Sequence, residues 1–79
     1  MRVKYKKGQD EDYYRIEFGN EKFDVNYHKN FPYLNTWSLH RYRPEKSNGF
    51  FRWYDPIFLN KKFESLKDIK KFIRDRKYL

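Results

Sequence analysis

Cysteine and alanine are absent from this 79-residue chain, and glycine and proline occur only three times each. Without cysteine the protein can form neither a disulfide nor a thiolate metal site, and its histidines show no metal-ligand spacing. The glycines are isolated, so the chain has no glycine-rich loop of the kind that cradles phosphate groups. The sequence therefore predicts no metal, no cofactor and no small-molecule ligand.

Long apolar segments are also missing. The longest apolar run is three residues, at 57–59, whereas a membrane-spanning helix needs about 20. Residues 1–14 contain no apolar stretch like that of a secretory signal. Because 79 residues is a typical length for one domain, we expect a single domain over residues 1–79, a cytoplasmic location and no membrane partner.

Aromatic residues and positive charge are abundant instead. Aromatics make up 23% of the chain, and its formal net charge is +8. Residues 1–35 carry seven Lys/Arg against six Asp/Glu, and residues 36–79 carry twelve against five. Such asymmetry indicates an acidic partner, usually nucleic acid. AT-rich coding, as in many phages, would also enrich lysine and aromatic residues, although it does not explain the asymmetry.

Residues 13–27 predict a β-hairpin. Gly19 and Asn20 suit a two-residue turn with glycine at the first central position, and this turn sets Phe18 opposite Glu21. In this register apolar residues pair on one face and opposite charges pair on the other, whereas a slip of one residue destroys both patterns. The expected pairs are Ile16 with Phe23, Tyr14 with Val25, Glu17 with Lys22, and Arg15 with Asp24.

Alternation of apolar and polar residues predicts three further strands, at residues 2–7, 36–43 and 50–54. The first is expected to be an edge strand, because its lysines discourage further pairing. Asp55 and Pro56 are expected to break the last strand. Residues 57–59 then resume it, either as an extension or as a fifth strand.

The connections between these strands have their own signals. Residues 8–12 predict a solvated acidic loop, and residues 44–49 predict a turn-rich loop. In the connection at residues 28–35, Pro32 interrupts any strand pairing. We expect the apolar residues of that connection to pack against the core; these are Phe31, Tyr33 and Leu34.

A helix is predicted from about residue 66 towards the C-terminus. Ser65 is a strong N-cap, and Asp68 three residues later resembles a capping box. One apolar stripe has helical spacing and is formed by Leu66, Ile69, Phe72 and Ile73. Phe63 is expected to pack on the first turns. The remaining helix surface is basic and carries Lys67, Lys70, Lys71, Arg74 and Lys77.

These elements predict an α+β fold, with an antiparallel sheet of four to five strands in two hairpins and one C-terminal helix packed on one face. The simplest assignment of the later strands buries Trp37, Leu39, Phe51 and Trp53. The other face of the sheet is then partly open. It is expected to carry His40, Tyr42, Arg52 and Tyr54, with Arg41 and Arg43 at the strand end.

Lysine and arginine bind phosphates, and unpaired bases stack on aromatic rings or guanidinium planes. The sequence therefore favours a nucleic-acid-binding protein of a phage or mobile element, acting on DNA or RNA. The candidate binding residues are Arg41, Arg43, Arg52, Tyr42, Tyr54 and His40 on the sheet, and Lys70, Lys71, Arg74 and Lys77 on the helix. They form one site only if the sheet and helix cations adjoin.

Two alternatives stay open. Tyrosine, tryptophan and arginine are enriched at protein interfaces, so a non-enzymatic protein that binds and inhibits a host protein also fits. A small ribonuclease-type toxin would use His40 with Arg41, Arg43 or Glu17 for proton transfer and phosphate binding. The two histidines are scattered, so we expect no catalytic residues and no enzyme activity.

Overall fold

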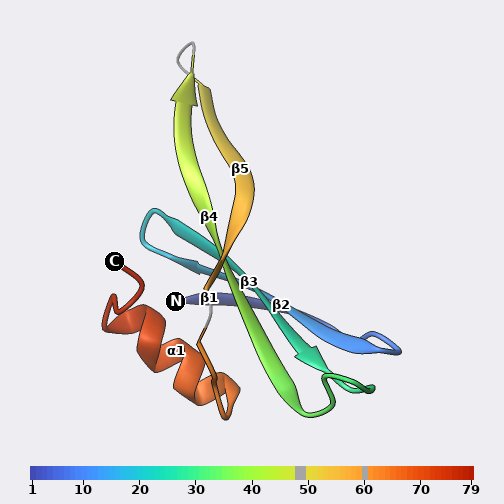
Figure 1. Ribbon diagram of the computed structural model, residues 1–79. Coiled ribbons are helices and arrows are strands. Elements are labelled where there is room, and N and C mark those ends of the chain that lie inside the picture. Colours follow the sequence, from blue (N-terminus) through green and yellow to red (C-terminus); the bar gives the residue numbers. More distant parts are fainter. Residues whose placement is uncertain (48–49, 60) are drawn as a thin grey trace.

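The computed structural model describes the backbone of residues 1–47, 50–59 and 61–79, and the side chains of residues 1–42, 59 and 61–79. Five antiparallel strands form one sheet in the order β1-β2-β3-β4-β5, so each strand pairs with its neighbour in sequence (Figure 1). The helix packs on one face of this sheet, which confirms the α+β fold. The elements are β1 (Arg2–Lys6), β2 (Glu11–Phe18), β3 (Glu21–His28), β4 (Thr36–Ser47), β5 (Phe50–Leu59) and α1 (Leu66–Arg74).

The hairpin of β2 and β3 has the predicted register. Phe18 lies opposite Glu21, and the other expected pairs follow along both strands. Gly19 has a φ of +60°, a conformation that glycine adopts without the steric penalty of a Cβ atom. Turn chemistry and side-chain pairing therefore specify the same register. The edge strand expected near the N-terminus is confirmed as β1, which pairs with β2 alone among the described strands.

The core lies between α1 and the face of the sheet to which the apolar hairpin residues point. Its fully buried side chains are Ile16, Phe23, Val25, Leu39, Ile69 and Ile73, and Phe63 and Tyr78 are nearly buried. Trp37, Leu66 and Phe72 pack against this cluster from its rim. The predicted apolar faces are thus confirmed for the described side chains, whereas the side chains of Phe51 and Trp53 lie outside the described residues.

The N-terminus of α1 is capped as predicted, with a small difference. The Ser65 hydroxyl accepts a hydrogen bond of 3.1 Å from the Asp68 backbone N–H. The Asp68 carboxylate accepts from the backbone N–H of Glu64 at 3.3 Å, one residue before the cap. The ring of Phe63 meets that of Phe72 edge-on at 5.2 Å. No helix in the described part of the chain has the length and apolar character needed to cross a bilayer.

The helix ends at Arg74, so the expectation that Lys77 belongs to it is wrong. Arg76 has a φ of 55°. Its N–H donates to the Ile73 carbonyl at 3.0 Å, and the Lys77 N–H donates to the Phe72 carbonyl at 3.1 Å. These two bonds form a Schellman motif, which reverses the chain at a helix end. The reversal carries Tyr78 back into the core.

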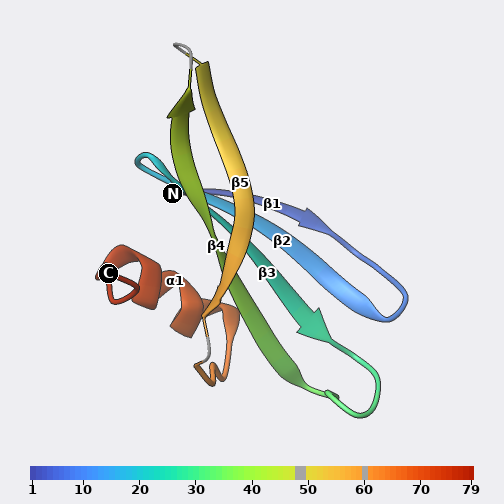
Figure 2. The ribbon, with the colours of Figure 1, turned by 45° about the horizontal axis from the view of Figure 1, so that its top comes forward.

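Strands β4 and β5 extend past the rest of the sheet as a two-stranded arm (Figures 1 and 2). Pairing of β3 with β4 ends at Phe23 and Arg41, whereas pairing of β4 with β5 continues to Ser47 and Phe50. The predicted turn over residues 44–49 is therefore too long. Pro44 fits within β4 because it lies beyond the end of β3, where its missing N–H interrupts no pairing with that strand.

Asp55 and Pro56 do not break the last strand either. β5 runs without interruption to Leu59, so residues 57–59 are an extension of it. The register shifts between Arg41, which pairs with Ile57, and Arg43, which pairs with Tyr54. Such a shift is a β-bulge, which absorbs extra residues of one strand without ending the pairing.

The connection of residues 28–35 contradicts the sequence prediction. Phe31 is 85% exposed, Tyr33 64% and Leu34 39%, so these side chains do not fill the core. The C-terminal part of the chain fills the core side of the sheet instead, with Phe63, Ile69, Ile73 and Tyr78. Backbone hydrogen bonds hold the loop in place. In one of them the Asn35 N–H donates to the His28 carbonyl at 2.9 Å.

The expected acidic loop is also shorter than predicted, because Glu11 and Asp12 belong to β2. Lys29 Nζ lies 2.8 Å from Asp12 Oδ1, and the Lys29 backbone N–H donates to the Asp10 carbonyl at 3.0 Å. The ion pair with Lys29 lowers the pKa of Asp12. These acidic residues are therefore bonded to the loop that follows β3, and they join two connections at one end of the sheet.

Candidate nucleic-acid interface

The face of the sheet opposite α1 is called here the open face (Figure 2). Every second residue of β1, β2 and β3 lies on it, together with His40 and Tyr42 of β4. The registers align one row of polar residues directly across four strands. Lys4 lies opposite Arg15, Arg15 opposite Asp24, and Asp24 opposite His40. Because neighbouring strands are about 4.8 Å apart, this row brings cationic, anionic and titratable groups together on one surface.

Asp24 organises the middle of the row, since it is only 7% exposed. Its Oδ1 accepts a hydrogen bond of 3.1 Å from Arg15 Nε, and its Oδ2 accepts one from the Tyr42 hydroxyl. Arg15 Nη2 also donates to the Tyr13 hydroxyl at 3.1 Å. The network therefore holds the Arg15 guanidinium and the Tyr13 ring in fixed positions beside each other.

The same network sets the protonation of its members. The hydrogen bond to Asp24, and then burial, raise the pKa of Tyr42 to about 12. The bond to Asp24 also raises the pKa of Arg15, while burial raises that of Tyr13. At neutral pH both tyrosines are uncharged and Arg15 is a cation, so the only charge that faces Asp24 within this network is positive.

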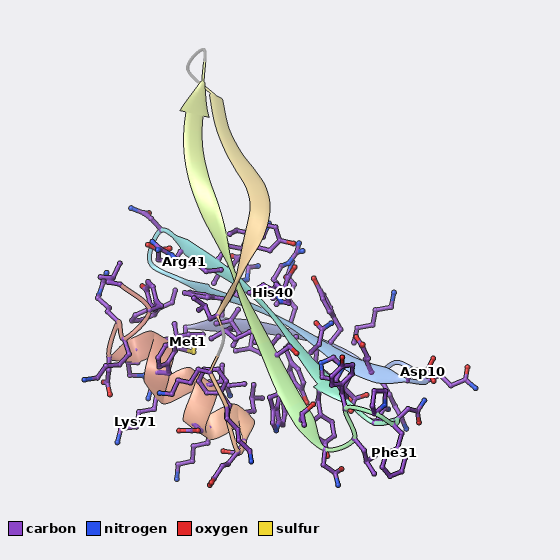
Figure 3. All side chains as sticks on the ribbon, in the orientation of Figure 1. Met1, Asp10, Phe31, His40, Arg41 and Lys71 are labelled. Carbon is purple, nitrogen blue, oxygen red and sulfur yellow. The ribbon has the colours of Figure 1, made fainter. Side chains whose placement is uncertain are left out.

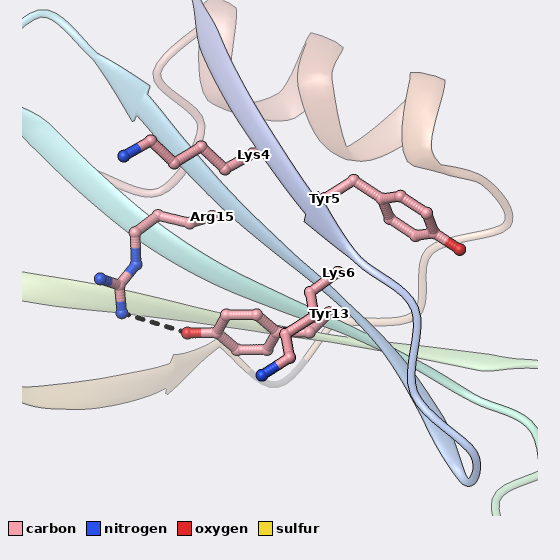
Figure 4. Close-up of a pocket in the computed structure, with 5 residues that line it drawn as sticks. All are labelled: Lys4, Tyr5, Lys6, Tyr13 and Arg15. Atoms are coloured by element: carbon pink, nitrogen blue, oxygen red, sulfur yellow. Dashed lines mark hydrogen bonds between the residues drawn. The ribbon is translucent and has the colours of Figure 1, made fainter.

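The edge of the open face is basic. Arg2, Lys4 and Lys6 alternate along β1 and are exposed, and they are called here the basic edge. Lys6 lies directly opposite Tyr13. A shallow hollow of about 230 Å³ lies at this place and is lined by Lys4, Tyr5, Lys6, Tyr13 and Arg15 (Figure 4). The surface of the hollow thus presents two ammonium groups, a guanidinium and a phenol ring.

Among the residues predicted to bind from the sheet, His40 and Tyr42 lie on the open face. Arg41 does not, because its pairing with Phe23 places it on the face that α1 covers. Its guanidinium donates two hydrogen bonds of 3.0 Å to the Glu21 carboxylate, which raises its pKa. It also lies 4.9 Å from the centroid of the Tyr78 ring. The prediction that groups Arg41 with the open face is therefore corrected.

The other predicted sheet residues, Arg43, Arg52 and Tyr54, have side chains outside the described residues. Their backbones lie in the arm, where Arg43 pairs with Tyr54 and Arg52 pairs with Glu45. The backbones of these three residues therefore lie at neighbouring positions of the ladder that β4 and β5 form. It also places them beyond the last residue of β4 that pairs with β3.

The predicted helix cations do not join the open face. Lys71 and Arg74 are exposed on α1, Lys70 is half-buried, and Lys77 is exposed just past the helix end. Figure 3 shows Lys71 on the outer side of α1, away from His40. A second shallow hollow brings lysines together with two carboxylates, which oppose anion binding; it is lined by Lys61, Asp68, Lys71, Phe72, Asp75 and Lys77. The described cations of the open face and the cations of the helix therefore form two separate surfaces.

The two histidines have different environments. His28 Nδ1 lies 3.1 Å from Glu11 Oε1 and its Nε2 lies 2.6 Å from the Ser38 hydroxyl, so both ring nitrogens have partners. His40 lies across from Asp24 on the open face. Within the described residues, no group of three His, Asp or Glu side chains is arranged to hold a metal ion. The ribonuclease interpretation, which rests on His40, stays a prediction.

Sequence reasoning missed the basic edge, Tyr13 and Arg15 as candidate binding residues. The signal for Arg15 was present, because the hairpin register puts it on the face opposite Ile16. Alternation likewise places Arg41 on the same side as Leu39. What the sequence does not contain is the register of β1 with β2, because the connection at residues 7–10 has no two-residue turn that would fix it.

Comparison of the chain with protein-family models, with curated protein sequences and with solved structures gave no match. The function must therefore be inferred from the geometry and chemistry of the protein's own residues.

Proposed function

We propose that this protein binds nucleic acid through the basic edge and the adjoining part of the open face. The observation that carries the proposal is the juxtaposition of Arg2, Lys4 and Lys6 on one strand with Arg15 and Tyr13 on the next. Cations of this kind hold phosphate groups, and the aromatic ring offers a surface for a base. The proposal includes a cytoplasmic location and a phage or mobile-element source.

The surroundings of these residues favour an anionic ligand. The side chains of the basic edge are exposed, so a ligand can reach them without moving any described part of the protein. Arg15 is held by Asp24 but its side chain remains 34% exposed. The net charge of +8 adds a long-range attraction for polyanions. Local geometry and overall charge therefore point to the same class of partner.

The test is a pair of charge-matched triple variants. Replacing Arg2, Lys4 and Lys6 by Gln should weaken binding of a labelled oligonucleotide in fluorescence anisotropy. It should also reduce the slope of log affinity against log salt by about 2, because each lost phosphate contact removes about 0.7 to 0.9 of slope. The control replaces the exposed cations Lys62, Lys67 and Lys71 by Gln, which removes the same net charge from the helix side.

The expected result is a large loss for the basic-edge variant and a small one for the control. Equal losses would mean that net charge, and not this site, determines binding. A loss confined to the control would move the site to the helix side of the protein, where the predicted binding residues are Lys70, Lys71, Arg74 and Lys77. If the wild-type protein binds neither single-stranded nor double-stranded DNA or RNA at low salt, the proposed function is wrong.

A second candidate function has its own observation. The loop after β3 exposes Phe31, Tyr33 and Leu34 to solvent, and Phe31 lies at its tip (Figure 3). Exposed aromatic residues of this kind are typical of protein interfaces. The loop therefore favours the alternative in which the protein binds and inhibits a host protein. Capture of one stoichiometric protein that resists nuclease, and that is lost with F31S and Y33S together, would support this alternative. Capture that survives both substitutions would exclude the loop.

A further inference from the structure

We infer that the hollow between β1 and β2 binds one nucleotide unit of an unpaired strand, with the phosphate between Lys4 and Arg15 and the base on the ring of Tyr13. The inference rests on the proposed function and specifies its ligand, because it distinguishes single-stranded from double-stranded nucleic acid.

Two adjacent cross-strand pairs define the subsite. Lys4 lies opposite Arg15, and two residues further along β1 Lys6 lies opposite Tyr13. Both pairs point to the open face, and residues two apart in a strand are separated by about 6.8 Å. Figure 4 shows Lys4, Lys6, Tyr13 and Arg15 on one side of β1 and Tyr5 on the other side. One end of the hollow is therefore suited to a phosphate and the other to a base.

Arg15 is prepared for phosphate binding by its own contacts. A guanidinium has five N–H donors, and the Nε–H donates to Asp24 while one Nη2–H donates to Tyr13. The bond to Asp24 fixes the plane of the guanidinium, while the remaining donors can still meet an oxyanion. The exposed ammonium of Lys4 supplies the second positive group from the facing strand. A site fixed before the ligand arrives loses less conformational entropy on binding.

Tyr13 provides an uncharged aromatic surface. Its hydroxyl is already protonated at neutral pH, and burial raises its pKa further, so it does not repel an anionic ligand. Its hydroxyl accepts the hydrogen bond from Arg15, which holds the ring in the hollow. Bases of any sequence stack on such a ring. The subsite is therefore expected to show little sequence preference.

The geometry favours single strands over duplexes. A duplex presents its phosphates but keeps the faces of its bases stacked inside, whereas an unpaired strand can place one base flat on a protein ring. The hollow measures about 230 Å³, which suits part of one nucleotide and not a helix. Lys6 and Arg2, at the two ends of the basic edge, are positioned to meet the neighbouring phosphates of an extended strand.

The closing experiment compares one sequence as single-stranded RNA, single-stranded DNA and duplex DNA at low salt by fluorescence anisotropy. We expect the single strands to bind at least tenfold more tightly than the duplex. Y13L should lose about tenfold on single strands and little on the duplex, whereas Y13F, which keeps the ring, should lose less than threefold. Y33L is the control, because Tyr33 is an exposed tyrosine outside the hollow. A mononucleotide is titrated in parallel, and it should bind far more weakly than the strand.

Circular dichroism establishes that each variant is folded. If Y13L does not fold, photocrosslinking of a 5-bromouridine strand to the wild-type protein replaces it. A crosslink within residues 4–15 supports the subsite, and crosslinks found only elsewhere overturn it.

Equal binding of single strand and duplex, an unchanged affinity in Y13L, or a mononucleotide that binds as tightly as the strand would each refute the inference. In those cases loss of binding in the basic-edge variant would leave the proposed function standing. Only the absence of binding to every nucleic acid tested refutes both.

Discussion

Replacing the buried carboxylate of Asp24 by an amide, D24N, tests whether the polar row stabilises the fold as well as the surface. The substitution keeps the size of the side chain but removes its charge and one acceptor oxygen. Arg15 and Tyr42 both donate to this carboxylate in the wild-type protein. In the variant these two donors have only one oxygen to share, and the new amide N–H group faces a donor.

The expected loss of stability follows from these contacts. A hydrogen bond to a charged group contributes about 1.5 to 3 kcal/mol. The hydrogen bond from Arg15 is expected to contribute only about 1 kcal/mol to the free energy of unfolding, because the Arg15 side chain is 34% exposed and solvent screens the interaction. With about 1.5 kcal/mol for Tyr42, D24N should lower the free energy of unfolding by about 2.5 kcal/mol. A domain of this length has a total of about 4 to 12 kcal/mol.

Urea unfolding followed by tryptophan fluorescence and circular dichroism measures this loss. With an m-value of about 1 kcal/mol/M, the midpoint should fall by about 2.5 M. Y42F alone should cost about 1.5 kcal/mol, and the double variant should cost less than the sum, with a coupling of about 1 kcal/mol. The control is E17Q, which changes a carboxylate of β2 on the same face and should cost less than about 0.5 kcal/mol.

Two results would refute this reasoning. A midpoint for D24N within 0.5 M of the wild-type value would show that the row contributes little to stability. A loss in E17Q as large as that in D24N would show that any carboxylate of the sheet has the same effect, so the burial and bonding of Asp24 would not be the cause.

Two further predictions concern backbone strain and pH. R76G should stabilise the protein by about 0.5 to 1 kcal/mol, because the left-handed conformation at this position penalises any residue with a Cβ atom. Thermal unfolding measures the gain, and the control R74G, within α1, should instead destabilise the protein by about 1 kcal/mol. A lower melting temperature in R76G would contradict the interpretation. Stability should fall as the pH rises from 10 to 12, because the unfolded chain releases the Tyr42 proton near pH 10 whereas the folded state holds its pKa at about 12. The stabilisation that comes from the raised pKa of Tyr42 is complete below pH 10. Y42F should therefore flatten the decline in urea midpoints between pH 9 and 11.5. An equal decline in Y42F would assign the effect to other tyrosines.

The part of the fold that was predictable from the sequence is the part specified by local signals. Gly19 and Asn20 define a turn, and the register that follows is supported by both faces of the hairpin. Ser65 marks the start of α1 in the same local way. In each case residues within a few positions of one another determine the outcome.

Predictions that depended on competition for space failed. Phe31 and Tyr33 are apolar enough to fill a core, but they are exposed, and the C-terminal residues Phe63 and Tyr78 belong to the core instead. The place of Tyr78 depends on the left-handed conformation of Arg76, which no glycine announces in the sequence. Hydrophobicity predicts which residues can be buried, and it does not decide between candidates from distant parts of the chain.

The candidate site was only partly predictable for a related reason. The sequence predicts an open sheet face with His40 and Tyr42 on it. The described cations of that face come from strands of the sheet and not from α1, and the register of β1 with β2 aligns Lys4 with Arg15. Since α1 covers the opposite face, its lysines cannot add to this surface.

The strictly sequential order of the strands has a consequence for how the chain folds. Each strand from β2 to β5 pairs with the strand before it, so each pairing closes a short loop and costs little chain entropy. Docking of the C-terminal segment is different, because Tyr78 contacts Phe23, which lies far earlier in the sequence. Proteins dominated by local pairings fold fast, and distant contacts slow the process. We therefore expect the hairpin of β2 and β3 to form early and the sealing of the core by the C-terminal residues to come last.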